Sequence, residues 1–455
     1  MEGVSLAERQ VCEASKAVAE QHKEKANAAF KAKHYREAVD EYTAATEADP
    51  SNPIYLSNRS FAHLRLEEFG AALVDASKAI ELDPTYVKAY YRRGDAAFAL
   101  ARFKDAIRDF RAAARLAPRD PDVRKKVTGG VLAEAEKQQK RIRFEEALSS
   151  GEEKPVSETI VIEDVALDSS RLWNDMVAAF RDGRQLARRY MYWIVLEAQR
   201  LLRALPSLVE VAVPAGTRIT VCGDTHGQFF DVCNIFELAG KPSEANPFLF
   251  NGDFVDRGSW SVEVILTLFA YKCLYPDHMH LTRGNHEAKS MNLIYGFYGE
   301  VREKCGPTAV EVFRETFCWL PLGYVLDGKP PDAGHMCEMM WSDPRPAPGR
   351  EPNARGVGIA FGPDVTRDFL ERNGLSLLVR SHEVKDEGYE VAHDGYCVTI
   401  FSAPNYCDQM GNKGAYITFE GGEMAPHFTQ FDAVPHPDVK PMKYAGSMMN
   451  GMFGM

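Results

Sequence analysis

Residues 218–227 read Arg-Ile-Thr-Val-Cys-Gly-Asp-Thr-His-Gly, an apolar run that passes directly into a polar cluster. The alternating β-branched residues of Arg218–Cys222 are typical of a buried strand. A glycine on either side of Asp224 and His226 permits tight turns and close backbone approach. A strand that ends in an aspartate and a histidine places them where α/β folds bind their ligands.

Further strand-like runs follow in the C-terminal part of the chain, and three of them also end in polar clusters. The runs are Phe248 to Phe250, His278 to Leu281, Leu377 to Val379 and, without such a cluster, Cys397 to Phe401. The clusters are Gly252-Asp253-Phe254-Val255-Asp256-Arg257-Gly258, Arg283-Gly284-Asn285-His286-Glu287 and Arg380-Ser381-His382-Glu383. Helical patterns over 171–205, 262–271 and 310–317 accompany these runs, and together they predict an α/β domain.

The residue types that recur in the clusters are Asp, His and Asn, which ligate metals through oxygen or imidazole nitrogen. One Asp-x-His is more often a hydrogen-bonded pair than a metal site, but four clusters in order favour a metal site. A donor set without thiolate suits Mn, Fe or Zn. Two such ions about 3.5 to 4 Å apart can activate water and hold a phosphoryl group. The pattern therefore indicates metal-assisted hydrolysis of a phosphate ester.

The N-terminal region repeats itself every 34 residues. The matching columns are Pro50, Pro84 and Pro118; Tyr35, Phe69 and Phe103; Ala38, Ala72 and Ala106; and Ala45, Ala79 and Ala113. Small residues let two antiparallel helices approach closely, the aromatic residue fills the gap between them, and the proline ends the second helix. This pattern resembles the tetratricopeptide repeat and predicts an all-α superhelix of three repeats over 19–118, with a capping helix and linker over 119–157.

The polar clusters resemble the signatures of metal-dependent serine/threonine protein phosphatases. These signatures are Gly-Asp-x-His-Gly at 223–227, Gly-Asp-x-Val-Asp-Arg-Gly at 252–258 and Gly-Asn-His-Glu at 284–287, extended by 380–384 and by Ser-Ala-Pro-Asn-Tyr-Cys-Asp at 402–408. With repeats in front, the likeness is to the type 5 family and runs from about residue 19 to the C-terminus. It implies an α/β metallophosphoesterase-type β-sandwich domain over 158–440, followed by a tail over 441–455.

The resemblance also implies a metal centre with two divalent ions, which are Mn, Fe, Zn or Mg in such enzymes. Asp224 and His226 would bind the first ion, Asn285 and His382 the second, and Asp253 would bridge the two. The substrates implied are phosphoproteins.

The same resemblance assigns catalytic roles. His286 would be the general acid that protonates the departing serine or threonine oxygen, with Asp256 orienting its imidazole. Arg257 and Arg355 would bind the phosphate, because the planar guanidinium matches its oxygens. The walls of the site would come from Tyr295 and Tyr406.

Five polar residues fall on the first helices of successive repeats, the helices that line the concave face of such a superhelix. They are Lys23, Asn27, Asn58, Lys88 and Arg92. The set is similar to the carboxylate clamp with which some tetratricopeptide domains bind the C-terminal Glu-Glu-Val-Asp of heat-shock chaperones. Lys and Arg would donate to carboxylates, and the asparagines would bind the peptide backbone. A plain solvated basic face is the alternative.

One stretch of the phosphatase pattern is absent. The family has a further metal-ligating histidine, in a His-Gly-Gly stretch between segments that match 320–322 and 341–344. Here residues 325–329 pass straight into Pro330, so the second metal keeps Asp253, Asn285 and His382. His335, the sole histidine of the shortened segment, is a poor substitute on a Pro/Gly-rich loop. A deletion near 329–330, by alternative splicing or imperfect gene prediction, explains the gap better.

The composition of the chain excludes several classes of protein. The 455 residues are 45% hydrophobic and 26% charged, as in globular domains, and a formal net charge of −11 disfavours nucleic acid as a partner. Uncharged runs fall short of the roughly 18 residues of a membrane span, and the N-terminus lacks a secretory signal pattern. The nine cysteines are scattered, without Cys-x-x-Cys pairs. These features predict no integral membrane association and a cytoplasmic and nuclear location.

Three functions remain open at this point. The first is a phosphoprotein phosphatase whose repeats bind chaperone tails and restrain the catalytic cleft, with Glu67 among the restraining contacts. The second is a catalytically impaired splice or gene-model variant that acts only as a binding adaptor through its repeats. The third is a nucleotide or bis-phosphate hydrolase, which the Ser-Ala-Pro-Asn-Tyr-Cys stretch at 402–407 disfavours.

Overall fold

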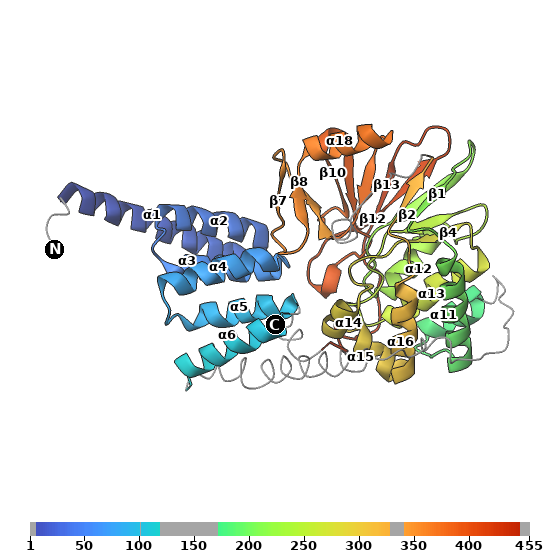
Figure 1. The fold of residues 1–455 in the computed structure, drawn as a ribbon, viewed down its shortest axis with the longest axis horizontal. Coiled ribbons are helices and arrows are strands. Elements are labelled where there is room, and N and C mark those ends of the chain that lie inside the picture. Colours follow the sequence, from blue (N-terminus) through green and yellow to red (C-terminus); the bar gives the residue numbers. More distant parts are fainter. Residues whose placement is uncertain (1–5, 101, 119–171, 328–340, 446–455) are drawn as a thin grey trace. The chain divides into compact units, whose positions relative to one another are not determined.

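The computed structural model describes residues 6–100, 102–118, 172–327 and 341–445 (Figure 1). The chain divides into two compact units. The first contains the N-terminal helices together with the short segment Pro352–Val357, and the second contains the central and C-terminal remainder. None of the described helices has both the length and the hydrophobicity that crossing a bilayer requires.

The first unit is built from helices that pair along the chain. They are α1 (Leu6–Lys31), α2 (Tyr35–Ala48), α3 (Pro53–Arg65), α4 (Phe69–Leu82), α5 (Val87–Ala99) and α6 (Phe103–Leu116). Each odd-numbered helix packs against the next even-numbered one, and the pairs stack side by side (Figure 1). The repeated alanines, such as Ala38, Ala72 and Ala106, are fully buried between helices. This arrangement confirms the predicted tetratricopeptide superhelix, whereas the expected cap and linker over 119–157 lie outside the described residues.

Buried ion pairs recur with the same 34-residue period as the sequence. The guanidinium of Arg59 on α3 donates to both oxygens of Asp75 on α4, at 2.8 and 2.7 Å. One repeat later, Arg93 donates to Asp109 in the same way, at 2.7 and 2.9 Å. Because the aspartates are buried, each pair fixes how the two helices of its own repeat pack together.

The second unit contains several helices and short helical turns. They are the π-helical turn η3 (Leu172–Val177), α10 (Ala178–Arg181), α11 (Arg188–Arg203), α12 (Phe229–Leu238), α13 (Ser261–Leu274), α14 (Lys289–Tyr295), α15 (Phe297–Lys304), α16 (Pro307–Phe317), α18 (Pro363–Asn373) and the 3₁₀ turns η4 (His393–Gly395) and η5 (Tyr406–Asp408). The helix expected over 171–205 is interrupted after Arg181, where Gly183 takes a left-handed φ of 73° that ends the helical turn.

The strands of this unit form several sheets. Their bounds are β1 (Leu208–Val211), β2 (Arg218–Cys222), β3 (Phe248–Phe250), β4 (Met279–Leu281), β5 (Gly323–Leu326), β6 (Asp343–Pro344), β7 (Arg350–Pro352), β8 (Ile359–Phe361), β9 (Leu378–Arg380), β10 (Tyr389–Ala392), β11 (Cys397–Ile400), β12 (Gly414–Glu420) and β13 (His427–Phe431). The largest sheet has the order β13-β12-β2-β3-β4, in which β2, β3 and β4 are parallel. A second sheet has the order β10-β11-β9. The other described strands form the two-stranded sheet β1-β5 and the three-stranded sheet β6-β8-β7.

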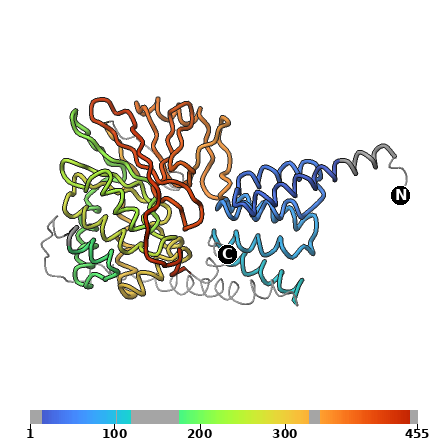
Figure 2. The backbone as a smooth tube through the Cα atoms, turned by 180° about the vertical axis from the view of Figure 1, so that it is seen from behind, coloured from blue at the N-terminus to red at the C-terminus, as the bar shows by residue number. Residues whose placement is uncertain are grey.

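Two apolar cores lie on opposite faces of the five-stranded sheet. Val221 and Leu249 pack with Val398 and Ile400 of the three-stranded sheet, so that the two sheets face each other as a sandwich. On the other face, Cys222, Phe248 and Phe250 belong to a larger core shared with α11, α12, α13 and α16. Figure 2 shows the same layering from behind. The unit is therefore the predicted α/β domain built on a β-sandwich.

Candidate metal and phosphate site

The expected metal ligands lie where strands end. Asp224 and His226 follow β2, Asp253 follows β3, Asn285 follows β4, and His382 follows β9. Because β2, β3 and β4 run parallel, their carboxyl ends meet at one edge of the sheet. An isolated bridge between Asp224 and Phe401 joins this edge to the end of β11 in the second sheet. Four segments that are far apart in sequence thus converge.

Most of these side chains are buried although they are polar. Asp224 is 2% exposed, Asp253 3%, Asn285 3% and His226 4%. Burial of carboxylates and imidazoles is costly unless they are paired or bind a metal. The backbone is also strained at the site, since His226, Asp253 and His382 have left-handed φ values of 41°, 48° and 84°. Such strain in residues with side chains typically collects at functional sites.

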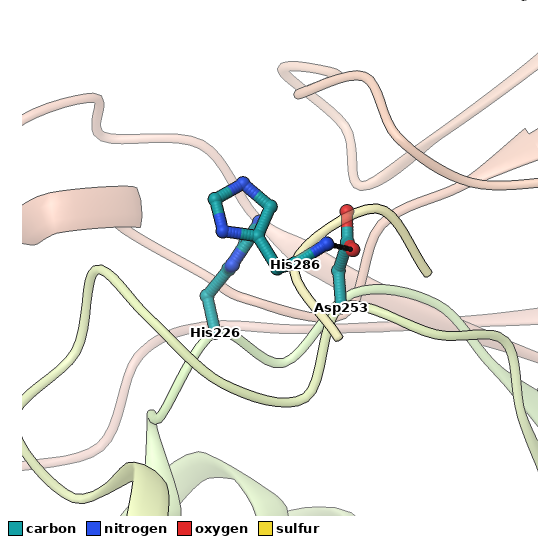
Figure 3. Close-up of side chains that lie close together, drawn as sticks. All are labelled: His226, Asp253 and His286. Atoms are coloured by element: carbon teal, nitrogen blue, oxygen red, sulfur yellow. Dashed lines mark hydrogen bonds between the residues drawn. The ribbon is translucent and has the colours of Figure 1, made fainter. Parts of the chain in front are cut away.

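The donor atoms lie close enough to share a cation. One ligand atom from each of His226, Asp253 and His286 lies within 4.8 Å of the others (Figure 3). Nε2 of His226 lies 3.9 Å from Oδ2 of Asp224, and Nδ1 of His382 lies 3.7 Å from Oδ2 of Asp253. The terminal amide of Asn285 reaches within 2.9 Å of both His382 Nδ1 and Asp253 Oδ2. All the predicted ligands therefore meet in one cluster.

The pKa values of the two aspartates in the cluster are shifted in opposite directions. Burial, reinforced by the neighbouring Asp253, holds the pKa of Asp224 well above its ordinary value. Burial acts on Asp253 in the same direction, but His286, His382 and His226 outweigh it and hold the pKa of that carboxyl below its ordinary value. Burial also holds the pKa of His226 well below its ordinary value, which keeps the imidazole neutral. Neutral imidazole and ionised carboxylate are the forms that ligate metals, so His226 and Asp253 are held in the forms that suit a divalent cation.

Glu287 holds together two of the loops that carry the cluster, a role that its place in the Gly-Asn-His-Glu motif did not reveal. Its buried carboxylate accepts hydrogen bonds from the backbone N–H groups of Asp253 at 2.8 Å, Phe254 at 2.9 Å and Gly284 at 2.9 Å. Burial, followed by the charge of Asp253, raises the pKa of Glu287 to about 8. The side chain joins the loop after β3 to the loop after β4.

Gly284 allows these two loops to touch. A Cβ atom at this position would lie 2.2 Å from Oδ1 of Asp253 and 2.3 Å from its backbone nitrogen. Carbon atoms do not approach that closely, so any larger residue would displace Asp253. The backbone N–H of His286 then donates to Oδ1 of Asp253 at 2.8 Å (Figure 3). The glycine thus sets the distance between the metal cluster and His286.

His286 is held by a buried carboxylate. Its Nδ1 lies 3.0 Å from Oδ2 of Asp256, which is fully buried. Asp256 also accepts from the backbone N–H of Phe297 at 2.8 Å and from the side-chain amide of Asn292 at 3.1 Å. Asn292 was not identified from the sequence, because no motif includes it. Because Nδ1 bonds with Asp256, Nε2 is the imidazole nitrogen that remains available to a substrate.

Three of the predicted phosphate-binding and wall residues, Arg257, Tyr295 and Tyr406, contact one another or the histidines of the cluster. Arg257 is 1% exposed, and its guanidinium carbon lies 3.8 Å from the centroid of the Tyr295 ring. The Tyr295 ring is 5.2 Å from that of His286, and the Tyr406 ring is 5.1 Å from that of His226. Arg355 lies in the segment Pro352–Val357, which groups with the first unit.

The five predicted clamp residues all lie on first helices: Lys23 and Asn27 on α1, Asn58 on α3, and Lys88 and Arg92 on α5. Tyr42 donates to Oδ1 of Asn27 at 2.6 Å and also bonds with Asn58, and Arg92 donates to Oδ1 of Asn58 at 3.1 Å. These contacts join four helices, α1, α2, α3 and α5, into one polar chain. Lys88 is exposed, whereas Arg92 is 7% exposed and also donates to Ser57. Lys23 contacts Glu20.

The predicted deletion point and His335 lie in 328–340, outside the described residues. Before this segment, β5 ends at Leu326 and pairs in parallel with β1. After the gap, Asp343 in β6 is held by Arg380 of β9 at 2.6 Å, and the Trp341 ring lies 5.4 Å from that of His382. The segment after the gap therefore packs beside the metal cluster.

Three family profiles match the chain. Residues 217–386 match the calcineurin-like phosphoesterases, residues 132–210 match the PPP5 TPR repeat region, and residues 87–120 match a tetratricopeptide repeat. The first match contains all the predicted metal ligands. It also contains the predicted general acid, His286.

Curated relatives match over almost the whole chain. Human serine/threonine-protein phosphatase 5 is 47% identical over 472 residues, covering 95% of this chain and 94% of the relative. The Arabidopsis thaliana protein of the same name is 47% identical over 530 residues, covering 95% and 97%. Both alignments are longer than the 455 residues of this chain, so both relatives have segments without a counterpart here.

A solved structure agrees with these relatives. A Saccharomyces cerevisiae protein serine/threonine phosphatase, described as similar to human PP5, is 39% identical and superposes with a TM-score of 0.56. It covers 60% of this chain and 98% of its own chain. With the metal cluster on a β-sandwich and the repeats at the N-terminus, these matches lead to one conclusion. The chain is a protein phosphatase of the serine/threonine-protein phosphatase 5 family.

Proposed function

We propose that this chain hydrolyses phosphoserine and phosphothreonine in proteins at the cluster of Asp224, His226, Asp253, Asn285 and His382. The observation that carries the proposal is the convergence of four strand-end segments on one buried set of oxygen and imidazole donors. The membership in a phosphatase family supports the same reaction.

These five residues would hold two divalent ions, of which Mn, Fe, Zn and Mg suit the donor set. When bound, such ions neutralise phosphate charge and lower the pKa of water. The asymmetric pKa shifts of Asp224 and Asp253 suit a site in which Asp253 is the shared, ionised ligand. The absent His-Gly-Gly stretch leaves the second ion with Asp253, Asn285 and His382 from the described residues.

His286 would protonate the departing alcohol oxygen. Because Nδ1–H donates to Asp256, the transferable proton is the one on Nε2. Asp256 is fixed by Phe297 and Asn292, so it holds the ring in one orientation. Serine and threonine alkoxides are poor leaving groups, and this proton therefore matters most for phosphoprotein substrates.

Arg257 would bind the phosphate oxygens through its planar guanidinium. Its burial against Tyr295 fixes its orientation and removes competing water. Arg355 would be a second phosphate ligand, and Tyr295 and Tyr406 would form walls beside the histidines.

Phosphate release from a phosphoserine peptide, with and without Mn²⁺, tests the proposal. We expect turnover that requires Mn²⁺ and that Asp253→Asn abolishes, with Asp182→Asn, an exposed aspartate, as the matched control. The absence of turnover from folded protein that retains Mn²⁺ would support the adaptor function instead. Turnover of nucleotides but not of phosphopeptides would support the third function.

We also propose that the first unit binds the C-terminal Glu-Glu-Val-Asp of heat-shock chaperones. Asn27, Asn58 and Arg92 on first helices, joined through Tyr42 of α2, offer amide and cationic donors, and exposed Lys88 lies one turn from Arg92. Such donors suit a terminal carboxylate and an aspartate side chain. Restraint of the catalytic unit by the repeats, with Glu67 among the contacts, and a cytoplasmic and nuclear location remain further predictions.

Calorimetric titration with a peptide that ends in Glu-Glu-Val-Asp tests the clamp. We expect Lys88→Ala to weaken binding by about tenfold, as the loss of one charge-assisted pair implies. Lys78→Ala removes the same charge from an exposed position on α4 and should bind normally. Equal affinities for the two variants would contradict the clamp.

A further inference from the structure

Residues Val434–Ala445, here called the C-terminal strap, follow β13 and belong to the second unit. Figure 2 shows this last part of the described chain, in dark red, passing across that unit. The strap contains no regular helix or strand. Its position is fixed by separate contacts rather than by a continuous ladder of hydrogen bonds.

The first half of the strap is attached near the Tyr406 loop. The backbone N–H of Val434 donates to Oδ1 of Asp231 at 2.9 Å, and Asp231 is 3% exposed. His436 lies with its Nε2 3.1 Å from Oδ1 of Asp408, two residues after Tyr406. The His436 ring also makes an edge contact with Trp260, with centroids 5.1 Å apart.

The second half is attached to the loop that carries Arg257. Ser259 Oγ donates to the carbonyl of Lys440 at 2.8 Å and accepts from the backbone N–H of Lys443 at 3.3 Å. The backbone N–H of Met442 donates to the carbonyl of Arg257 itself at 2.6 Å. Three backbone groups of the strap thus bond to the Arg257 loop, two of them to the hydroxyl of Ser259 and one to the carbonyl of Arg257.

The side chain of Met442 extends this contact to the guanidinium. Met442 is 1% exposed, and its sulfur lies 4.0 Å from Nη1 of Arg257. Met442 also has a left-handed φ of 53°, which is unfavourable for a residue with a side chain. Surrounding contacts must stabilise that conformation. The contacts in question are those that the strap makes with Arg257 and Ser259.

We propose that Met442 is a positioning residue for phosphate binding. The thioether of Met442 and the ring of Tyr295 both contact the guanidinium of Arg257, and together they hold it in one orientation. An arginine loses rotamer entropy when it is immobilised, and a side chain that is already fixed loses less on binding. The role of Met442 rests on the proposed function, in which Arg257 binds the phosphate. It connects the C-terminal part of the chain to the affinity of the site.

Three variants test this role in the full chain loaded with Mn²⁺. Met442→Ala should lower kcat/KM for a phosphoserine peptide about tenfold, mainly by raising KM, and should weaken inhibition by inorganic phosphate by a similar factor. Met442→Leu keeps the apolar volume and should restore both values to within about threefold. Lys440→Ala, on the same strap, changes only an exposed side chain and should leave both values unchanged.

A fall in kcat with KM and phosphate inhibition unchanged would show a loss of folded protein and would overturn the positioning role, as would unchanged kinetics. If the alanine variant does not fold, Met442→Val carries the same expectation with a smaller cavity. If the wild-type chain turns nothing over, the proposed function fails, and calorimetric titration with inorganic phosphate still decides the role of Met442. Equal phosphate affinities for wild type and the Met442 variants would then overturn it.

Discussion

Nδ1 of His286 lies 3.0 Å from Oδ2 of Asp256, and both side chains are buried at the end of the main sheet. The contact fixes which imidazole nitrogen is available to a substrate. Asp256 is itself held by Asn292 and by the backbone N–H of Phe297. The orientation of the proposed general acid is therefore set by residues from three segments before any substrate arrives.

We expect Asp256→Asn and His286→Asn each to lower kcat for a phosphoserine peptide by about 10²- to 10⁴-fold, since proton donation contributes factors of this size. The loss should be much smaller for an aryl phosphate, whose leaving oxygen needs no proton. Steady-state kinetics on the two substrates would measure it. Equal losses on both substrates would mean that the pair does not act through the leaving group.

Gly284→Ala should weaken metal binding, because the new Cβ would overlap Oδ1 of Asp253. We expect the affinity for Mn²⁺ to fall by about 10- to 100-fold, as when groups that orient metal ligands are lost. Gly374→Ala is the control, because Gly374 has a left-handed φ of 63° but no neighbouring atoms within 4 Å. That variant should lose some stability and no metal affinity. A normal affinity in Gly284→Ala would contradict the proposed role of Asp253.

Asp109→Ala should destabilise the first unit by about 3 kcal/mol, because it leaves Arg93 without its buried carboxylate. Asp105→Ala breaks an exposed pair with Arg108 on the same helix and should change the free energy of unfolding by less than about 1 kcal/mol. Urea unfolding followed by far-UV circular dichroism would compare the two. Similar effects would show that burial of the repeated ion pair does not matter.

The stability of the second unit should depend on pH through Asp231. Burial raises the pKa of this carboxyl to about 6, above the unfolded value, so its favourable contribution is present below about pH 4 and is lost as the pH rises through 6. Relative to Asp231→Asn, the wild type should lose up to about 3 kcal/mol between these limits. Tryptophan fluorescence would follow the unfolding, since the tryptophans all lie beyond residue 172. A pH-independent difference would contradict the shift.

Much of the fold followed from local sequence patterns. The 34-residue repeat predicted the helix pairs, because small and aromatic residues at fixed spacing have few other uses. β2 and β3 have the predicted bounds, whereas β4 and β9 begin one residue later than expected. β11 stops at Ile400 because Phe401 forms the bridge to Asp224 instead. Strand ends were shifted by tertiary pairing, which local patterns do not contain.

The candidate site could likewise be predicted only in part from the sequence. Its five ligands lie in short motifs, four of them next to a glycine, and could be named from the sequence. Glu287, Asn292 and Met442 could not be assigned roles, because they act on backbone N–H groups or on side chains from distant segments. Arg355 was named through resemblance alone, and its placement in the first unit reflects packing that no motif describes.

The most direct test of the central claim is the equilibrium binding of Mn²⁺ to the purified, folded chain near neutral pH. The convergence of Asp224, His226, Asp253, Asn285 and His382 predicts two bound equivalents for each wild-type chain and the loss of that binding in Asp253→Asn. A folded wild-type chain that retains no Mn²⁺, or whose binding is unchanged by Asp253→Asn, would contradict the account.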